Sequence, residues 1–191
     1  PANKRLRSDD AYTPGGQAGH RPDYATQVYC KILKDIYPDT PIVIGGIEAS
    51  MRRFAHYDYW QDKILSSMLE LSGADLLCYG MSEKSIVEIA NHIDNDGHIY
   101  NCFGIDQIAY LSDAKDIKKD DICLNSYTDV LADKKKYAEN FVIVEREANS
   151  FSTRRITQEL EHGKLIVNPP NRPFTEAEMD EIYAFPYTRL P

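Results

Sequence analysis

A short stretch rich in reactive side chains, from Arg52 to Trp60, is the strongest candidate for a functional site. It offers two guanidinium groups, one imidazole, one carboxylate and three aromatic rings with polar tips or edges. The guanidinium groups of Arg52 and Arg53 can each hold a phosphate or a carboxylate through two hydrogen bonds. The imidazole of His56 can transfer protons near neutral pH. The pattern indicates a binding site for an anionic group and assigns no catalytic residue.

The same stretch has a structural interpretation that stays open at this point. The tyrosine and tryptophan side chains would cover the edge of a sheet, and the arginines would pair with acids such as Asp9 or Asp10. In either interpretation the stretch lies at a surface that contacts a substrate or another domain. The candidate residues for substrate or interdomain binding are Gly45, Gly46, Glu48, Arg52, Arg53, His56, Tyr57, Asp58 and Trp60.

Two glycines, Gly45 and Gly46, follow a short apolar run at residues 41–44 that is typical of a buried parallel strand. Open α/β sheets bind ligands outside the carboxyl ends of such strands, where glycines let a ligand approach the backbone. A tight turn from strand to helix that needs a positive φ explains the same glycines, and we favour it. Glu48 follows them and is interpreted as a charge at a helix start rather than as a general base.

Helical patterns flank the candidate stretch on both sides. Apolar residues recur at three- and four-residue spacing and predict a helix over residues 25–36. A second helix is predicted around residues 64–69. A third begins at Ser82, which can cap it, and ends before Gly97.

Two continuous apolar runs, at residues 41–45 and 75–79, predict buried strands. The helical pattern between them needs a right-handed crossover, so the strands should be parallel and adjacent. Further edge strands are expected around Tyr100 and over residues 108–111. Together these elements predict an α/β fold over residues 22–111, a partial doubly wound parallel sheet whose first strands lie upstream.

A parallel sheet also predicts that the candidate residues converge. Loops that follow neighbouring parallel strands leave the sheet at the same edge. We therefore expect Gly45 to Ser50, and His56 to Trp60, to lie near residues 80–82.

The remaining segments differ in character from this core. Residues 1–21 are polar and predict an irregular lead-in, whereas residues 112–191 predict a helix-rich connector. The elements expected in the connector are a helix over about residues 126–148, a shorter helical pattern to Leu160, a strand at residues 164–167 and a helix that begins at Thr175 with Glu178 in capping-box spacing.

Composition narrows the classes of protein that fit. The formal net charge of −8 argues against a nucleic-acid or anionic-membrane surface. No apolar run approaches the roughly 18 residues that span a bilayer, and no signal peptide is visible. The four cysteines are at least 21 residues apart, so no metal site is expected in this chain. Their even number allows two disulfides, but the apolar settings of Cys30 and Cys78 favour buried free thiols and a cytoplasmic location.

Three stretches carry a resemblance to a known family. They are Arg5-Leu6-Arg7 with Asp9-Asp10-Ala11-Tyr12-Thr13-Pro14; Gly45-Gly46-Ile47-Glu48-Ala49-Ser50 with Arg52-Arg53 and Ala55-His56-Tyr57-Asp58-Tyr59-Trp60; and Asn168-Pro169-Pro170 with Phe185-Pro186-Tyr187. Together they resemble the YgiQ-type radical SAM proteins over essentially the whole chain.

The resemblance implies a segment that lies between an N-terminal α/β region and a radical SAM barrel. It makes the sheet similar to the end of a cobalamin-binding-like or flavodoxin-like domain, although the cobalamin-ligating DxHxxG motif is not in this chain. It implies a [4Fe-4S] cluster and S-adenosylmethionine as cofactors of the parent protein. The family's CxxxCxxC motif is expected shortly beyond a segment such as Pro186-Tyr187-Thr188-Arg189, so no cofactor is expected within this chain.

Two functions follow, and the sequence leaves open whether the protein is an enzyme. In the first, the chain frames the substrate or interdomain side of the catalytic barrel of an iron–sulfur enzyme. The chain is then inactive alone, and its partners are the other domains of the same protein. In the second, it is a non-catalytic α/β interaction or ligand-binding module. The substrate is unknown in both.

Overall fold

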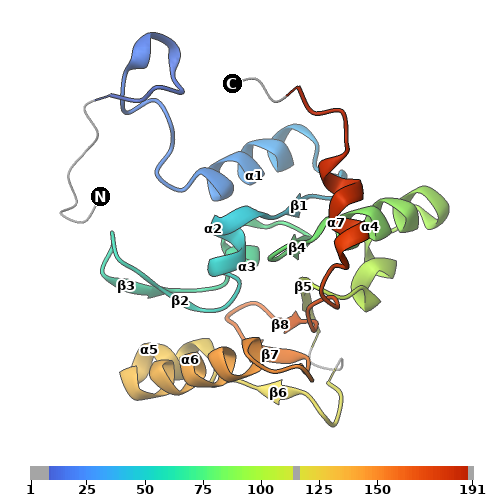
Figure 1. Ribbon diagram of the computed structural model, residues 1–191. Helices are drawn as coiled ribbons and strands as arrows, with labels where there is room; N and C mark the ends of the chain where they lie inside the picture. Colours follow the sequence, from blue (N-terminus) through green and yellow to red (C-terminus); the bar gives the residue numbers. More distant parts are fainter. Residues whose placement is uncertain (1–8, 114–116, 189–191) are drawn as a thin grey trace.

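The structure is a computed structural model that describes residues 9–113 and 117–188 (Figure 1). Arg5-Leu6-Arg7 and Arg189, which belong to the motifs above, lie outside the described residues. One mixed sheet forms the centre of the molecule, with strand order β1-β4-β5-β8-β7-β6. In that order the strands are β1 (Val43–Ile44), β4 (Leu76–Cys78), β5 (Ile108–Ser112), β8 (Lys164–Val167), β7 (Ile156–Glu159) and β6 (Ile122–Cys123).

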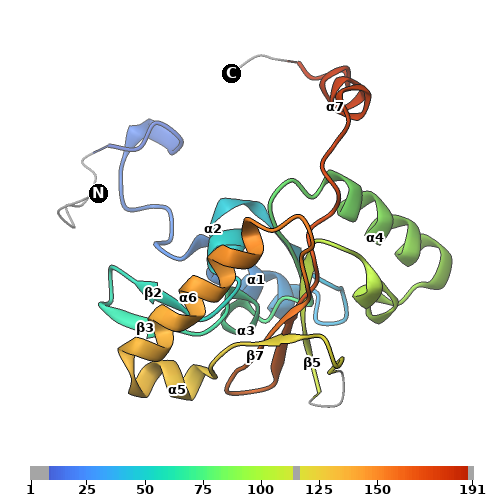
Figure 2. The ribbon, with the colours of Figure 1, turned by 60° about the horizontal axis from the view of Figure 1, so that its bottom comes forward.

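Helices cover both faces of this sheet (Figures 1 and 2). One face carries α1 (Ala25–Ile36), α2 (Gly46–Met51), α3 (Met68–Ser72), α5 (Tyr127–Ala132) and α6 (Lys134–Ala148). The other face carries α4 (Glu83–Asp96) and the 3-10 helix η2 (Ile99–Gly104). Outside these layers are the short turn η1 (Pro14–Gly16), the hairpin of β2 (His56–Asp58) and β3 (Lys63–Leu65), and the C-terminal helix α7 (Glu176–Tyr183).

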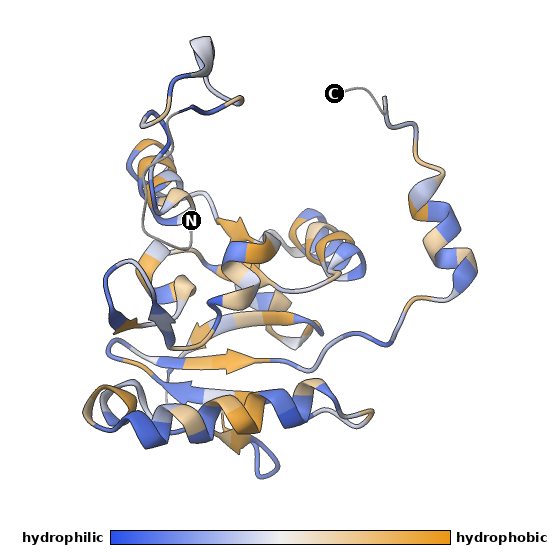
Figure 3. Ribbon diagram, turned by 60° about the vertical axis from the view of Figure 1, so that its left-hand side comes forward, coloured by the Kyte–Doolittle hydropathy of each residue, from blue (hydrophilic) through white to orange (hydrophobic). Residues whose placement is uncertain are grey.

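The alternation of side chains along each strand explains why two helical layers are needed. Leu77 points into the core shared with Met68, whereas Leu76 and Cys78 point into the core shared with Ile89. Both faces of β4 are apolar, so each face has to be covered by helices. This is why the sequence of β4 is continuously hydrophobic. Figure 3 shows this concentration of hydrophobic residues along the central strands.

The expected α/β fold is confirmed, together with several of its elements. The helix over residues 25–36 is α1. The parallel, adjacent pair is β1 and β4, with Val43 opposite Leu76. The strand at residues 164–167 is β8, and the C-terminal helix begins at Thr175 with a capping box.

Four local expectations were wrong, two because the segments pair with other strands and two because of contacts within a few residues. The helix expected from residue 64 begins only at Met68, since Ile64 and Leu65 pair with β2. The Tyr100 region is 3-10 helix rather than an edge strand, with the Tyr100 ring packed edge-on against Phe103. The helix expected over residues 126–148 is broken at Asp133, whose side chain caps α6. The helical pattern expected to Leu160 is strand β7, which is paired on both sides.

The sheet continues beyond the segment predicted to hold the α/β domain. Strand β5 lies between β4 and β8 and is antiparallel to both. Strands β6, β7 and β8 therefore extend the same sheet from the segment expected to be a helix-rich connector. The parallel pairs are β1 with β4 and β6 with β7, so the sheet is mixed. The proposed division of the chain at residue 111 stays a prediction.

A buried ion pair joins the starts of β6 and β7. Arg155 donates from Nε to Oδ1 of Asp121 at 2.8 Å and from Nη2 to Oδ2 at 2.7 Å. Both side chains are less than a tenth exposed. Burial alone would raise the pKa of Asp121, but the hydrogen bonds from Arg155 hold it below its usual value.

Replacing Asp121 by alanine should lower the free energy of unfolding by about 3–5 kcal/mol, because it removes the carboxylate that the buried guanidinium of Arg155 binds through two hydrogen bonds. Urea denaturation measures this change. The control is Arg172→Ala, which removes a mostly exposed partner of Glu178 and should cost less than about 1 kcal/mol. Equal costs for the two variants would show that the buried pair does not stabilise the sheet.

Candidate functional site

A groove lies at the carboxyl ends of the parallel strands β1 and β4, where open α/β sheets bind ligands. Its volume is about 320 Å³. The residues that line it are Val43, Ile44, Gly45, Cys78, Gly80, Ser82, Glu83 and Ile86. We call this the glycine groove, since Gly45 and Gly80 face each other across it.

The glycines of the groove meet two different backbone requirements. Gly46 has φ +75° and Gly80 has φ +64°, backbone angles that residues other than glycine rarely adopt. Gly45 is extended, but a Cβ there would lie 3.4 Å from the carbonyl oxygen of Cys78. The loops are joined because Gly80 donates its N–H to Oγ of Ser50 at 3.2 Å. The predicted convergence of Gly45 to Ser50 with residues 80–82 is therefore confirmed.

Glu48 links helix α2 to the start of helix α1. Its Oε2 accepts from Oγ1 of Thr26 at 2.6 Å, and its Oε1 accepts from Nη1 of Arg52 at 3.1 Å. Glu48 lies in the first turn of α2, as its interpretation as a helix-start charge expected. Arg52 thus has a counter-ion four residues away, rather than pairing with Asp9 or Asp10 as the structural alternative supposed.

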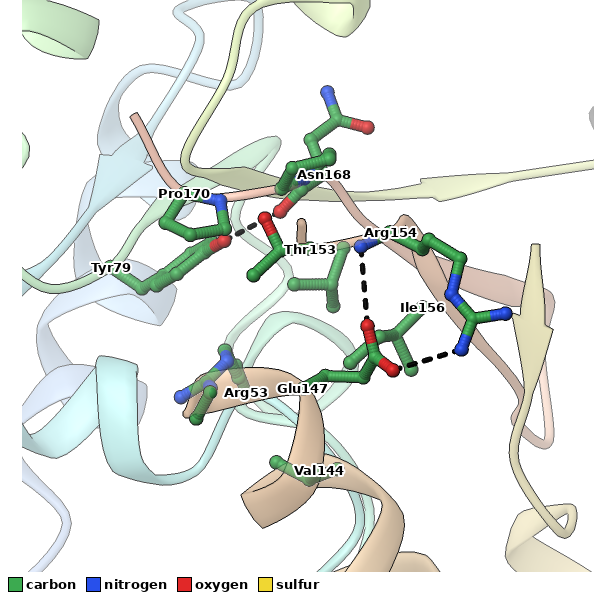
Figure 4. A pocket seen from close by; sticks show the side chains of 12 residues that line it. Arg53, Tyr79, Val144, Glu147, Thr153, Arg154, Ile156, Asn168 and Pro170 are labelled. Carbon is green, nitrogen blue, oxygen red and sulfur yellow. Dashed lines mark hydrogen bonds and ion pairs between the residues drawn. The ribbon is translucent and has the colours of Figure 1, made fainter. Parts of the chain in front are cut away.

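Arg53 does not share the contacts of Arg52 and instead lines a separate cavity (Figure 4). Its guanidinium lies over the rings of Phe54 and Tyr79, with centroid distances of 5.1 and 4.8 Å. Nη1 donates to the carbonyl oxygen of Ser50 at 2.6 Å. The Nε atom is buried and has no hydrogen-bond partner among the described residues. Burial lowers the pKa of Arg53, and the charges of Tyr79 and Glu145 partly oppose this effect.

A cavity of about 220 Å³ lies beside this guanidinium, between the sheet and the last turns of α6 (Figure 4). We call it the Arg53 cavity. Two of its wall residues, Glu147 and Arg154, form an ion pair of 2.9 Å. The other residues that line it are Tyr79, Val144, Ala148, Thr153, Ile156, Val167, Asn168, Pro169 and Pro170.

His56 and Asp58 belong to the β2–β3 hairpin and have structural contacts. The imidazole of His56 is buried, with Nδ1 3.2 Å from the carbonyl oxygen of Phe54. Asp58 accepts from the hydroxyl of Tyr24 at 2.5 Å and from the backbone N–H of Trp60 at 3.3 Å. Burial opposes ionisation of Asp58, but these hydrogen bonds keep its pKa below the usual value.

The hairpin does not join the glycine groove. Helices α2 and α3 lie between the hairpin and α4 in both Figure 1 and Figure 2. Its contacts go instead to Tyr24 beside α1 and to Tyr137 of α6, whose hydroxyl accepts from the backbone N–H of Tyr57 at 3.1 Å. Tyr57 and Trp60 are about half exposed. The candidate residues therefore fall into three places: the groove, the Arg53 cavity and the hairpin.

Gln107 fastens the edge of the groove, and no pattern in the sequence marks it as a functional residue. Gln107 is buried with φ +63°. Its Nε2 donates to the carbonyl oxygens of Tyr79 and Met81, both at 2.7 Å, and its Oε1 accepts from the N–H of Asn171 at 2.9 Å. This one amide side chain therefore joins the loop after β4 to the segment after β8.

The segment after β8 is held at several further points. The side chain of Asn168 donates to the carbonyl oxygens of Phe103 at 2.9 Å and Ile105 at 2.6 Å. Helix α7 is tied to α4 by the ion pair of Lys84 with Glu178, 3.0 Å long. Asn168 belongs to a motif that carried the family resemblance, so the sequence did mark this position.

The chain's cysteines do not form a cluster site in the part of the chain that the structure describes. All four are free thiols; Cys30, Cys78 and Cys102 are buried and Cys123 is exposed. Burial raises the pKa of Cys78 to about 11, and a protonated thiol is a poor metal ligand. No three cysteine, histidine, aspartate or glutamate side chains among the described residues converge on one point. The described residues therefore do not fit an iron–sulfur cluster.

The described helices were compared with what a membrane-spanning helix requires. Within residues 9–113 and 117–188, no helix combines the length and the apolar character that crossing a bilayer requires.

Comparison with known proteins gives one consistent result. Residues 1–191 match the family described as Radical SAM N-terminal. A UPF0313 protein of Bacteroides thetaiotaomicron is 49% identical over all of this chain and 33% of its own length. A UPF0313 protein of Porphyromonas gingivalis is 46% identical over all of this chain and 30% of its own length. The chain thus spans about a third of the curated relatives it matches, and no solved structure matches it significantly.

Replacing His56 should change how stability depends on pH. Burial lowers the pKa of His56 below its ordinary value of 6.5, so the unfolded chain binds this proton more readily than the folded chain. The free energy of unfolding should therefore fall as the pH drops below 6.5, by up to about 1.4 kcal/mol per pH unit from this residue. Urea denaturation between pH 7 and pH 5 should show a shallower fall for His56→Leu. The control is the exposed His20→Gln, and identical slopes in both variants would contradict the expectation.

Replacing Gln107 by leucine should loosen the groove edge. The change removes three hydrogen bonds and leaves two carbonyl oxygens without this donor, at a cost of about 2 kcal/mol. Hydrogen exchange should speed up at residues 79–82 and 169–172 and remain unchanged in α1. The control is Gln27→Leu on α1. Unchanged exchange at both segments would mean that Gln107 does not fasten them.

Proposed function

The chain belongs to the radical SAM N-terminal family, and from this we propose that it frames the substrate or interdomain side of a catalytic barrel in a cytoplasmic, [4Fe-4S]-dependent radical SAM enzyme. The observation that carries the proposal is the family match over residues 1–191. It is supported by relatives about three times as long, which have room for the barrel. The substrate of such an enzyme is not assigned.

In this proposal, the cluster and S-adenosylmethionine are held by another part of the protein. The cluster would supply the electron that cleaves S-adenosylmethionine and generates a radical. The described residues of this chain would position the neighbouring domain and shield its contents. If the cluster cysteines follow residues 186–189, as the resemblance implies, a barrel joined there would have the segment after β8 as its nearest neighbour.

The carboxyl edge of the sheet supports an interdomain role. The segment after β8 is fastened along this edge by Gln107 and Asn171, next to the glycine groove. Large apolar side chains are exposed on the elements that border the groove, and soluble proteins seldom leave such groups in water without a partner. They are Ile47 and Met51 of α2, Met81 after β4, and Ile86 and Val87 of α4.

The alternative, a non-catalytic interaction or ligand-binding module, is favoured by a different observation. Glu48, Arg52 and Asp58, three charged candidates of the sequence, are satisfied by contacts within the fold. Only the full protein distinguishes the two functions, because both use the same α/β scaffold.

The test uses the full-length protein, reconstituted with iron and sulfide without oxygen. We expect a [4Fe-4S] cluster, and reductive cleavage of S-adenosylmethionine to 5′-deoxyadenosine. Single alanine variants of Cys30, Cys78, Cys102 and Cys123 should keep their iron. Absence of a cluster from the wild-type protein would favour the non-catalytic module, and loss of iron in any of these variants would place the cluster in this chain.

A second pair of variants tests the framing role. Ile47→Asp introduces a charge on the exposed apolar edge and should reduce 5′-deoxyadenosine formation by roughly tenfold while iron content stays the same. The matched control is Val142→Asp, an exposed apolar position on α6. Equal rates in the two variants would contradict an interdomain role for this edge.

A further inference from the structure

The guanidinium of Arg53 forms no ion pair with another described residue, although the nearby charge of Glu145 partly offsets the effect of burial on its pKa. Arg21, Arg52, Arg154, Arg155 and Arg172 each form an ion pair. No carboxylate among residues 9–113 and 117–188 lies within ion-pair distance of Arg53. A guanidinium that has lost its water is costly unless an anion or several acceptors replace that water.

The contacts that Arg53 does make hold its side chain in place and leave hydrogen-bonding capacity unused. The aromatic faces of Phe54 and Tyr79 fix the plane of the guanidinium, and the carbonyl oxygen of Ser50 takes one N–H. A guanidinium has five N–H donors, and Nε–H is buried without a protein acceptor. Nε with one Nη nitrogen is the edge that binds a carboxylate through two hydrogen bonds. The aromatic rings thus preorganise the Arg53 guanidinium beside the cavity, and it retains donors that no described residue accepts from.

The neighbouring acid, Glu147, is not that acceptor. It is 7% exposed, and its two oxygens accept from Nη2 of Arg154 at 2.9 Å and from the N–H of Arg154 at 3.3 Å. Figure 4 shows the Glu147 carboxylate directed toward Arg154. The charged lining of the cavity is thus two arginines and one glutamate, which leaves one excess positive charge.

The volume and lining of the cavity limit the size and polarity of the rest of a ligand that carries the anionic group. Its 220 Å³ corresponds to about seven water-sized volumes of roughly 30 Å³ each. Apolar groups of Val144, Ile156, Val167 and Pro170 form much of the wall. Such a pocket excludes large or highly polar ligands and favours a compact apolar body.

We propose that the Arg53 cavity binds a small molecule that carries one carboxylate on a compact apolar body. The carboxylate meets the Arg53 guanidinium where it lines the cavity, and the apolar body packs against the aliphatic wall. A monoanion matches the single excess charge, whereas a phosphate dianion would need further donors and would lie near the carboxylate of Glu147.

Benzoate is a suitable probe because it combines a carboxylate with a compact apolar ring. Its binding to the full-length protein is measured by ligand-observed NMR and calorimetry, with benzamide as the neutral analogue and phenyl phosphate as the dianion. We expect benzoate to bind at least about tenfold more tightly than either analogue. Failure of benzoate to bind, or equal binding of benzamide, overturns the proposal; tighter binding of phenyl phosphate assigns the site to phosphate instead and also overturns it.

Two variants locate the binding. Arg53→Met keeps the aliphatic stem, removes the charge and should weaken benzoate binding at least about tenfold; Arg146→Met, an exposed arginine of α6, is the charge-matched control. Ala148→Phe fills the cavity from an exposed position without changing Arg53, so it tests the site even if Arg53→Met does not fold. Its control is Ala138→Phe, also exposed on α6. Undiminished binding to Ala148→Phe would place benzoate elsewhere.

Carboxylate binding is measured without iron or S-adenosylmethionine, so it is separate from the function proposed above. Loss of benzoate binding would leave the iron–sulfur proposal standing. Failure to assemble a cluster would leave the Arg53 cavity as a binding site of a non-catalytic module.

Discussion

The amide side chain of Gln107 is the interaction on which the arrangement of the site depends. It satisfies the carbonyl oxygens of Tyr79 and Met81 and receives the N–H of Asn171. Its own backbone has φ +63°, a conformation that costs a non-glycine residue of the order of 1–3 kcal/mol. Three hydrogen bonds of about 1 kcal/mol each offset that cost only when all are made. The Gln107 amide therefore couples the loop after β4 to the segment after β8.

Tyr79 carries this constraint from the glycine groove to the Arg53 cavity. Its carbonyl oxygen is bound by Gln107, its ring lies under the guanidinium of Arg53, and its hydroxyl donates to the carbonyl oxygen of Asn168 at 2.5 Å. Burial raises the pKa of the Tyr79 hydroxyl, so it remains a donor across the physiological range. A shift of the groove edge would thus move the ring that positions Arg53. The two sites share one backbone support, although no candidate residue of one lines the other.

The predictable parts of the fold are those that local sequence determines. Helix α1 has its own apolar stripe, β4 is apolar on both faces, and Thr175 with Glu178 forms a cap within one turn. The β7 segment lacks such a signal, because Thr157 and Gln158 are polar side chains buried only through pairing with distant strands. The predicted fold class was correct, whereas the number of strands and their directions depended on pairings that no local pattern records.

The site shows the same division between local and distant causes. The positive φ of Gly46 follows from a strand-to-helix turn and was foreseeable. The separation of Arg52 from Arg53 was not, because it depends on where α2 ends and on Tyr79, 26 residues further along the chain. Gln107 is a lone polar residue beside an apolar run, and nothing in its sequence neighbourhood distinguishes it from a surface glutamine.

The acidic composition makes the state of Arg53 informative. With 30 acids against 22 bases, the chain has more than enough carboxylates to neutralise every cation. Even the neighbouring Glu147 is turned toward Arg154, and the aromatic rings that hold Arg53 provide far less compensation than a carboxylate would. Arg53 is partly buried and forms no ion pair among the described residues, so an anion bound in the cavity would add a favourable interaction that the fold itself does not make. The placement of Arg53 is thus better explained by binding than by folding.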